Sequence, residues 1–78
     1  MLKITNSATV SEDRWILCGH LAGQWVAELR SNWDQVRDRS RGHRYVIDLS
    51  DVTGIDARGE ELLRQLKEEG AEFVAKGL

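Results

Sequence analysis

The sequence YVIDLSDVTGIDARGEELLRQLKEE, from Tyr45 to Glu69, contains a predicted strand, a polar loop and a predicted helix in direct succession. Residues 45–49 are rich in β-branched and aromatic side chains, which are typical of strands. Ser50 and Asp51 are turn-forming residues, and we expect them to end this strand. Such a strand-loop-helix succession is typical of α/β folds.

The helix is expected to begin near Asp56 and to end at Gly70. Leu62, Leu63 and Leu66 recur at helical spacing with charged residues between them. Asp56 suits the N-cap position, where a side-chain oxygen accepts a hydrogen bond from a backbone N–H of the first turn. Glycine is the usual residue just past the end of a helix. We therefore predict one capped, amphipathic helix here.

The rest of the chain supplies two strands and a helix before this unit and one strand after it. The predicted elements are strands at Leu2–Thr5 and Trp15–Gly19, a helix at Gln24–Asp38 and a last strand at Glu72–Ala75. Trp15–Gly19 is apolar on both faces, which indicates an interior strand. The order β-β-α-β-α-β predicts an α/β fold with a four-stranded mixed sheet and two helices mainly on one face.

Length and composition indicate one small domain spanning residues 1–78. The net charge of −2 gives no electrostatic case for binding nucleic acid. One cysteine, Cys18, excludes an intramolecular disulfide and fits a cytoplasmic setting. No apolar run reaches the ~20 residues of a membrane span, and no signal-peptide core stands at the N-terminus. We expect a cytoplasmic protein.

The central unit resembles the STAS domain, the fold of anti-sigma factor antagonists and of the cytoplasmic tails of sulfate transporters. The matching residues are Val46–Ser50, Val52–Thr53, Ile55–Gly59, Leu62–Leu63 and Gly70–Ala71. The family's usual loop is Asp-Ser-Ser-Gly, whose second serine a partner kinase phosphorylates. In this chain Ala57 and Arg58 occupy the two serine positions. The resemblance implies a STAS-like domain without the usual phosphoacceptor and without the helix and strand with which the family normally continues.

The resemblance also implies where a partner binds. In the family, the loop and the following helix contact a kinase-type anti-sigma factor. Carried over to this chain, the predicted partner-binding residues are Asp56, Ala57, Arg58, Gly59 and Glu60. Residues expected to support the loop are Asp48, Ser50 and Thr53, whose hydroxyls also leave phosphorylation of Ser50 or Thr53 open. For Asp48, a functional role at the strand end and hydrogen bonding to the following loop both stay open.

Arg58 is the main departure from the family's pattern. It places a permanent positive charge near the positive end of the helix dipole, so a neighbouring acid should offset it. Of the nearby acids, Glu61 has the spacing of a helical ion pair. Arg58 is interpreted either as a fixed contact for an acidic group on a partner or as drift in a loop that has lost its regulation.

Other candidate sites have simpler interpretations. Trp25 and Trp33 are expected to pack in the core rather than to hold a cofactor. Cys18 and His20 share one strand face, which would allow weak metal binding or redox sensitivity, but a plain buried thiol is favoured. The charged run Arg37–Arg44 is interpreted as a solvated helix end, with a phosphate or acidic-partner patch as the alternative.

No catalytic, metal or cofactor motif is present in the sequence, so we predict neither an enzyme nor a cofactor. The leading interpretation is a bacterial, cytoplasmic protein-interaction module of signalling and transcription regulation, resembling an anti-sigma factor antagonist. The first alternative is a self-associating scaffold or homodimer, because the last strand is expected to leave an open edge and the uncovered sheet face to be partly apolar. The second is a domain that binds a small ligand or nucleotide.

Overall fold

A four-stranded sheet with the strands in chain order, β1-β2-β3-β4, forms the frame of the molecule. The computed structural model describes residues 1–75. Residues 76–78 lie outside the described part. The elements are β1 (Leu2–Ala8), β2 (Glu12–Leu21), α1 (Gln24–Arg39), β3 (Arg44–Ile55), α2 (Ala57–Glu68) and β4 (Ala71–Val74). The predicted order of strands and helices is confirmed.

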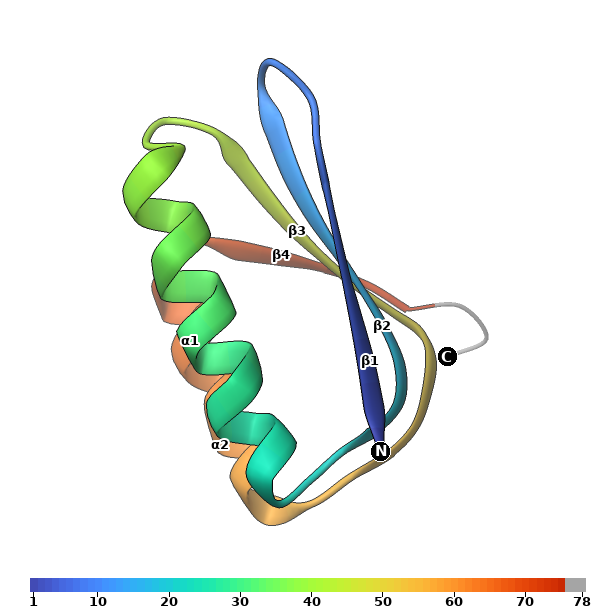
Figure 1. Cartoon of the computed structure of the whole chain (residues 1–78). Helices are drawn as coiled ribbons and strands as arrows, with labels where there is room; N and C mark the ends of the chain where they lie inside the picture. Colours follow the sequence, from blue (N-terminus) through green and yellow to red (C-terminus); the bar gives the residue numbers. More distant parts are fainter. Residues whose placement is uncertain (76–78) are drawn as a thin grey trace.

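The connections place both helices on one face of the sheet (Figure 1). Strands β1 and β2 form an antiparallel hairpin, while β2 with β3 and β3 with β4 are parallel. Each parallel pair is joined through a helix, and such crossovers are right-handed, so successive crossovers in one direction cover the same face. Both helices begin at the end of the sheet where β2 and β3 finish (Figure 1). The predicted mixed sheet with one covered face is confirmed.

Strand β3 is longer than the sequence predicts. Ser50 and Asp51 do not end it, because β3 continues to Ile55. The second half of β3 pairs with residues 18–21 of β2, with Cα partners such as Cys18 and Asp51. The backbone hydrogen bonds that β2 offers outweigh the turn preference of Ser50 and Asp51, so the loop before α2 contains little more than Asp56.

The second half of β2 is irregular and leaves Cys18 exposed. The register against β3 shifts between Ile16 and Cys18 and again between Gly19 and His20. Cys18 and His20 are both exposed, so the prediction of a buried thiol is wrong. The Cys18 side chain lies on the sheet face that carries no helix. Trp15 and Leu17 point to the opposite face and are buried in the core. In residues 1–75, no three acidic, cysteine or histidine side chains gather as a metal-binding group.

The core is built around three aromatic rings between the sheet and α1. The ring centroids of Trp15 and Trp33 lie 4.8 Å apart, and that of Tyr45 lies 5.3 Å from Trp33. Trp15 and Trp33 are fully buried. The Trp33 indole Nε1 donates a hydrogen bond of 3.1 Å to Glu69 at the end of α2. The predicted core role of Trp33 is confirmed, whereas Trp25 is only partly buried at the edge of the core.

The face of the sheet opposite the helices is covered by ion pairs around one apolar residue. Val46 is buried on this face. Arg44 pairs with Glu72 at 2.5 Å and with Glu12 at 3.6 Å, while Arg14 pairs with Glu12 at 3.3 Å. Long charged side chains shield apolar surface with their stems. This part of the uncovered face is therefore more polar than the sequence predicts.

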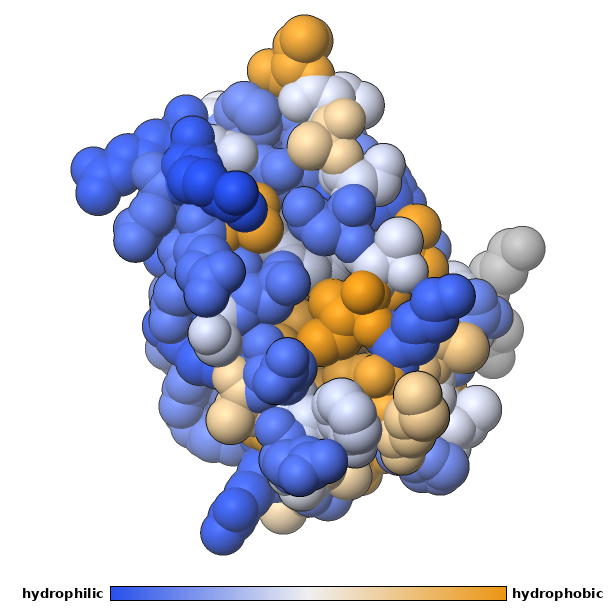
Figure 2. Space-filling view, viewed as in Figure 1, coloured by the Kyte–Doolittle hydropathy of each residue, from blue (hydrophilic) through white to orange (hydrophobic). Residues whose placement is uncertain are grey.

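Exposed apolar surface remains at a few places. Val10, in the turn of the β1–β2 hairpin, is 96% exposed, and Ile55 and Val74 are 41% and 39% exposed. In the view of Figure 2, apolar surface lies at the hairpin tip and in a hollow between α1 and β1, with hydrophilic side chains around it. These places are separate, so none of them forms a large continuous apolar patch in this view.

The aromatic core provides the first prediction. Trp33→Ala should lower the free energy of unfolding by about 3–5 kcal/mol, because a fully buried indole leaves a cavity. Trp25→Ala, the matched control on the same helix, should cost less than half as much, because Trp25 is only partly buried. Urea unfolding followed by far-ultraviolet circular dichroism measures both. Equal losses would contradict this assignment of the core.

Candidate functional site

The two crossover loops meet at one side chain, the carboxylate of Asp56. Its Oδ1 accepts a hydrogen bond of 2.7 Å from the backbone N–H of Gly59, which caps α2. Its Oδ2 accepts one of 3.0 Å from the N–H of Gly23, immediately before α1. The backbone N–H of Asp56 also donates to the carbonyl of Leu21 at 3.2 Å. One residue of the second loop thus fixes the starts of both helices, and its predicted N-cap role is confirmed.

The surroundings of Asp56 favour its ionised form. The N–H of Gly23, then that of Gly59 and then the nearby Arg58 guanidinium lower the pKa of the Asp56 carboxyl below its ordinary value of 3.8. The first turn of α1 contains no acidic residue, and the N-cap residue of α1, Gly23, has no side chain. Asp56 is therefore the carboxylate that serves the N-terminal ends of both helices.

Arg58 is exposed on the first turn of α2, and its predicted ion pair with Glu61 is wrong. Glu61 is held instead by Arg64, whose Nε lies 3.0 Å from the Glu61 carboxylate. Within the part of the chain that the structure describes, no carboxylate lies within ion-pair distance of the Arg58 guanidinium. The charge of Arg58 attracts the Asp56 carboxylate at longer range, while the hydrogen bonds of that carboxylate come from backbone N–H groups.

Of the remaining predicted contact residues, Ala57 and Glu60 are exposed and Gly59 is buried. A Cβ atom on Gly59 would lie 2.5 Å from the carbonyl oxygen of Leu21 and 2.9 Å from Cγ2 of Ile55. Gly59 therefore allows α2 to pack closely on the ends of β2 and β3. Its role within the molecule is to support the loop.

The three predicted support residues lie in β3 and not in the loop. Asp48 is paired with Ile16 and Val74 in the middle of the sheet, so its predicted place at the strand end is wrong. Its Oδ1 accepts a hydrogen bond of 2.9 Å from the N–H of Ser50, and its Oδ2 lies 4.0 Å from Arg14. Asp48 thus binds a backbone N–H two residues on, within β3 and not in a following loop. Thr53 is exposed in the second half of β3.

A groove of about 500 Å³ runs between α1 and α2 beside this loop. Its lining residues are Gly23, Val26, Ala27, Arg30, Ala57, Arg58, Glu61, Leu62 and Gln65. Ala57 and Arg58, which are predicted contact residues, belong to the α2 wall, whereas no residue of the α1 wall is among the predicted residues. The small exposed residue Ala27, beside the apolar stripe of α1, is the only signal for it in the sequence.

At the other end of the helix pair, Glu69 joins α1 to α2. Arg30 donates to its carboxylate at 2.6 Å, Arg37 at 3.0 Å and Trp33 at 3.1 Å. These donors, Arg30 first, lower the pKa of the Glu69 carboxyl below its ordinary value. Arg30 also pairs with Asp34 at 3.1 Å. Both arginines of α1 that face α2 are thus engaged within the molecule.

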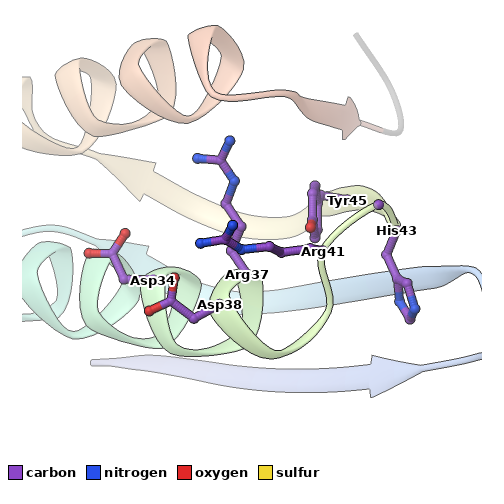
Figure 3. A pocket seen from close by; sticks show the side chains of 7 residues that line it. Asp34, Arg37, Asp38, Arg41, His43 and Tyr45 are labelled. Carbon is purple, nitrogen blue, oxygen red and sulfur yellow. The ribbon is translucent and has the colours of Figure 1, made fainter.

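The charged run at the end of α1 borders a second, polar hollow of about 460 Å³ (Figure 3). Arg37 and Arg41 share it with the carboxylates of Asp34 and Asp38. His43 points away from the arginines (Figure 3), and its Nδ1 lies 3.1 Å from the buried carboxylate of Asp13. The mixture of both charges in the lining favours the solvated-end interpretation over a phosphate site.

Comparison with known proteins identifies the fold. No protein-family model and no curated protein matches the sequence. The structure is similar to an anti-sigma-factor antagonist STAS domain from Rhodobacter sphaeroides, with a TM-score of 0.63 and 22% identity over 97% of this chain and 86% of that chain. It is also similar to a DUF3478-family protein with a SpoIIAA-like fold from Shewanella loihica, with a TM-score of 0.68 and 9% identity over 99% and 69% of the two chains.

The fold is therefore STAS-like, as the sequence resemblance predicts. Neither helix in residues 1–75 has the length and apolar character that a membrane crossing requires.

The double role of Asp56 gives the second prediction. Asp56→Ala should lower the melting temperature by roughly 4–8 °C at pH 7, because the cap of α2 is lost. The folded-state pKa lies below the ordinary 3.8, so this stabilisation is present above pH 3.8 and is lost as the pH falls through the folded-state value. The difference in melting temperature between wild type and variant should therefore stay constant above pH 3.8 and shrink as the pH falls below it. The exposed Asp51, changed to alanine, is the control; an equal loss there would contradict the assignment.

The close packing at Gly59 gives the third prediction. Helix propensity alone favours alanine over glycine by roughly 1 kcal/mol, yet Gly59→Ala should destabilise the protein by about 1–3 kcal/mol, because its Cβ overlaps Leu21. Ala57→Gly, two residues earlier in the same turn, is the control and should lose no more than roughly 1 kcal/mol. Urea unfolding measures the free energy of unfolding of both variants. A Gly59→Ala protein that is more stable than wild type would show that the packing around Gly59 is loose.

Proposed function

We propose that this chain is a non-catalytic protein-interaction module that resembles an anti-sigma factor antagonist but lacks a serine switch at the usual loop. The observation that carries the proposal is Arg58, an exposed cation at the start of α2 with no ion-pair partner among residues 1–75. Such a charge, held on a rigid helix and flanked by the small Ala57, is suited to a fixed contact with an acidic group.

The positions at the loop support the absence of a switch. A phosphate on a residue of the first turn would add about two negative charges at a helix N-terminus. Ala57 and Arg58 have no hydroxyl group, so neither accepts a phosphate by that route. Ser50 and Thr53, the hydroxyl residues predicted to support the loop, lie within β3. The interaction we propose is therefore constitutive.

The partner we propose is a kinase-type anti-sigma factor in the bacterial cytoplasm, bound through Asp56–Glu60 and the exposed side of α2. The fold supports this assignment by likeness to an anti-sigma-factor antagonist. In this arrangement Ala57, Arg58 and Glu60 make the contacts, while Asp56 and Gly59 hold the loop in shape. Charged contacts of this kind mainly set specificity and association rate.

Self-association is the second candidate function, and the edge of the sheet favours it. Within residues 1–75, β4 pairs with residues 45–48 of β3, whereas β3 continues to Ile55. The exposed Ile55 and Val74 lie near this edge of the sheet. Short or unpaired edges are places where a second chain adds its own strand. Binding of a nucleotide has less support, because no glycine-rich loop is present in the sequence.

An affinity capture from the lysate of the native host, read by mass spectrometry, tests the proposed function. Wild type should recover an ATP-binding protein of the anti-sigma type, and Arg58→Glu should reduce its recovery by roughly tenfold, because a repulsive charge replaces the contact. Arg41→Glu, the same change at an exposed arginine beyond the far end of α1, is the matched control and should leave recovery unchanged.

Two outcomes would contradict the proposal. Recovery of the chain alone, unaffected by Arg58→Glu, would leave the scaffold as the better account. If Arg41→Glu loses the partner and Arg58→Glu does not, the partner binds at the hollow at the end of α1 and not at the loop.

A further inference from the structure

The groove between α1 and α2 and the cation at its rim form one composite surface. We propose that it receives an acidic amphipathic segment of the partner protein, which inserts an apolar side chain between the helices and places a carboxylate on Arg58. This inference rests on the proposed function and adds the chemistry of the partner segment and a second wall, on α1, to the contact surface.

The groove offers apolar depth where small residues face each other. Leu62 is buried and lies at its base, and Val26 is half-buried. Ala27 on α1 and Ala57 on α2 are both exposed, and their short side chains leave the space between the helices open. A hollow of about 500 Å³ lies in the ~300–1,000 Å³ range of functional pockets. It therefore has room for a large apolar side chain.

The charges around the groove select an acidic partner. Arg30 is engaged by Glu69 and Asp34, and Glu61 is engaged by Arg64. Arg58 is the remaining charge of the lining, and within residues 1–75 no ion pair neutralises it. Arg58 lies at the end of the groove where both helices begin (Figure 1), and Asp56 already caps the backbone N–H groups there. A carboxylate beside the apolar anchor would complement the Arg58 guanidinium.

The shape of the surface fits a protein segment. Along α2 the lining extends over the nine residues from Ala57 to Gln65, which corresponds to a rise of about 12 Å along the helix axis. Exposed residues line both walls, so the groove is open to solvent along this length. Two turns of an amphipathic helix laid between two helices is a known mode of peptide recognition, in which anchors enter the groove and charges at the rim set the orientation.

Selection from a phage-displayed library of 12-residue peptides tests this proposal with defined probes. Selected peptides should carry aspartate or glutamate beside leucine, phenylalanine or tryptophan. Labelled peptides, measured by fluorescence anisotropy, should bind Arg58→Glu roughly tenfold more weakly than wild type. Ala27→Gln should also bind them roughly tenfold more weakly, because the longer side chain fills the groove. Arg41→Glu, the charge-matched control, should bind them as wild type does, and melting curves should show that all variants fold.

Amide chemical shifts locate the bound peptide. Titration of the isotope-labelled protein should shift the amides of residues 23–30 and 57–65. The proposal is overturned if no acidic peptide is enriched, if the shifts fall on β4 or on residues 37–45, or if Ala27→Gln binds like wild type. If the protein forms a dimer that Ala27→Gln abolishes, the groove binds a second copy of this chain and the proposal is overturned. If octanoate displaces the labelled peptide as well as an unlabelled copy of that peptide does, the groove binds a small carboxylate, which also overturns the proposal.

The same variants separate this inference from the proposed function. If the partner captured from the lysate is lost with Arg58→Glu but kept by Ala27→Gln, the loop binds the partner and the groove does not. If neither variant loses that partner, the proposed function fails together with the inference.

Discussion

The carboxylate of Asp56 is the constraint on which the functional end of the molecule depends. It accepts hydrogen bonds from the loop before α1 and from the first turn of α2 at the same time. The parallel strands β2 and β3 finish at the same end of the sheet, so the loops that follow them lie side by side. A single side chain therefore sets the distance between the two helix starts. The groove between the helices and the position of Arg58 follow from this link. At the opposite end, Glu69 joins the helices in a similar way.

Arg58 has no ion-pair partner within residues 1–75. The oxygens of Asp56 accept hydrogen bonds from backbone N–H groups, and the Arg58 guanidinium attracts this carboxylate only at longer range. Glu61, the acid whose spacing would suit an ion pair with Arg58, is paired with Arg64 instead. The loop therefore presents an exposed positive charge in a fixed place. The fold is STAS-like, and this exposed charge is the feature on which the proposed recognition of an acidic partner rests.

Local chemistry predicted much of this fold, and contacts between distant residues explain what it missed. The N-cap role of Asp56 and the extent of α1 and α2 follow from side-chain type and helical spacing, which act within one turn. The bond from Asp56 to Gly23 spans 33 residues and the contact of Arg30 with Glu69 spans 39, so no local pattern reports them. The extension of β3 past Ser50 likewise depends on β2.

Hydrogen–deuterium exchange of the protein in complex with its captured partner would show whether both helices form the binding surface. We expect slower exchange on binding in residues 23–30 and 57–65, the two walls of the groove. Protection confined to β4 or to residues 37–45, with the groove unchanged, would contradict it.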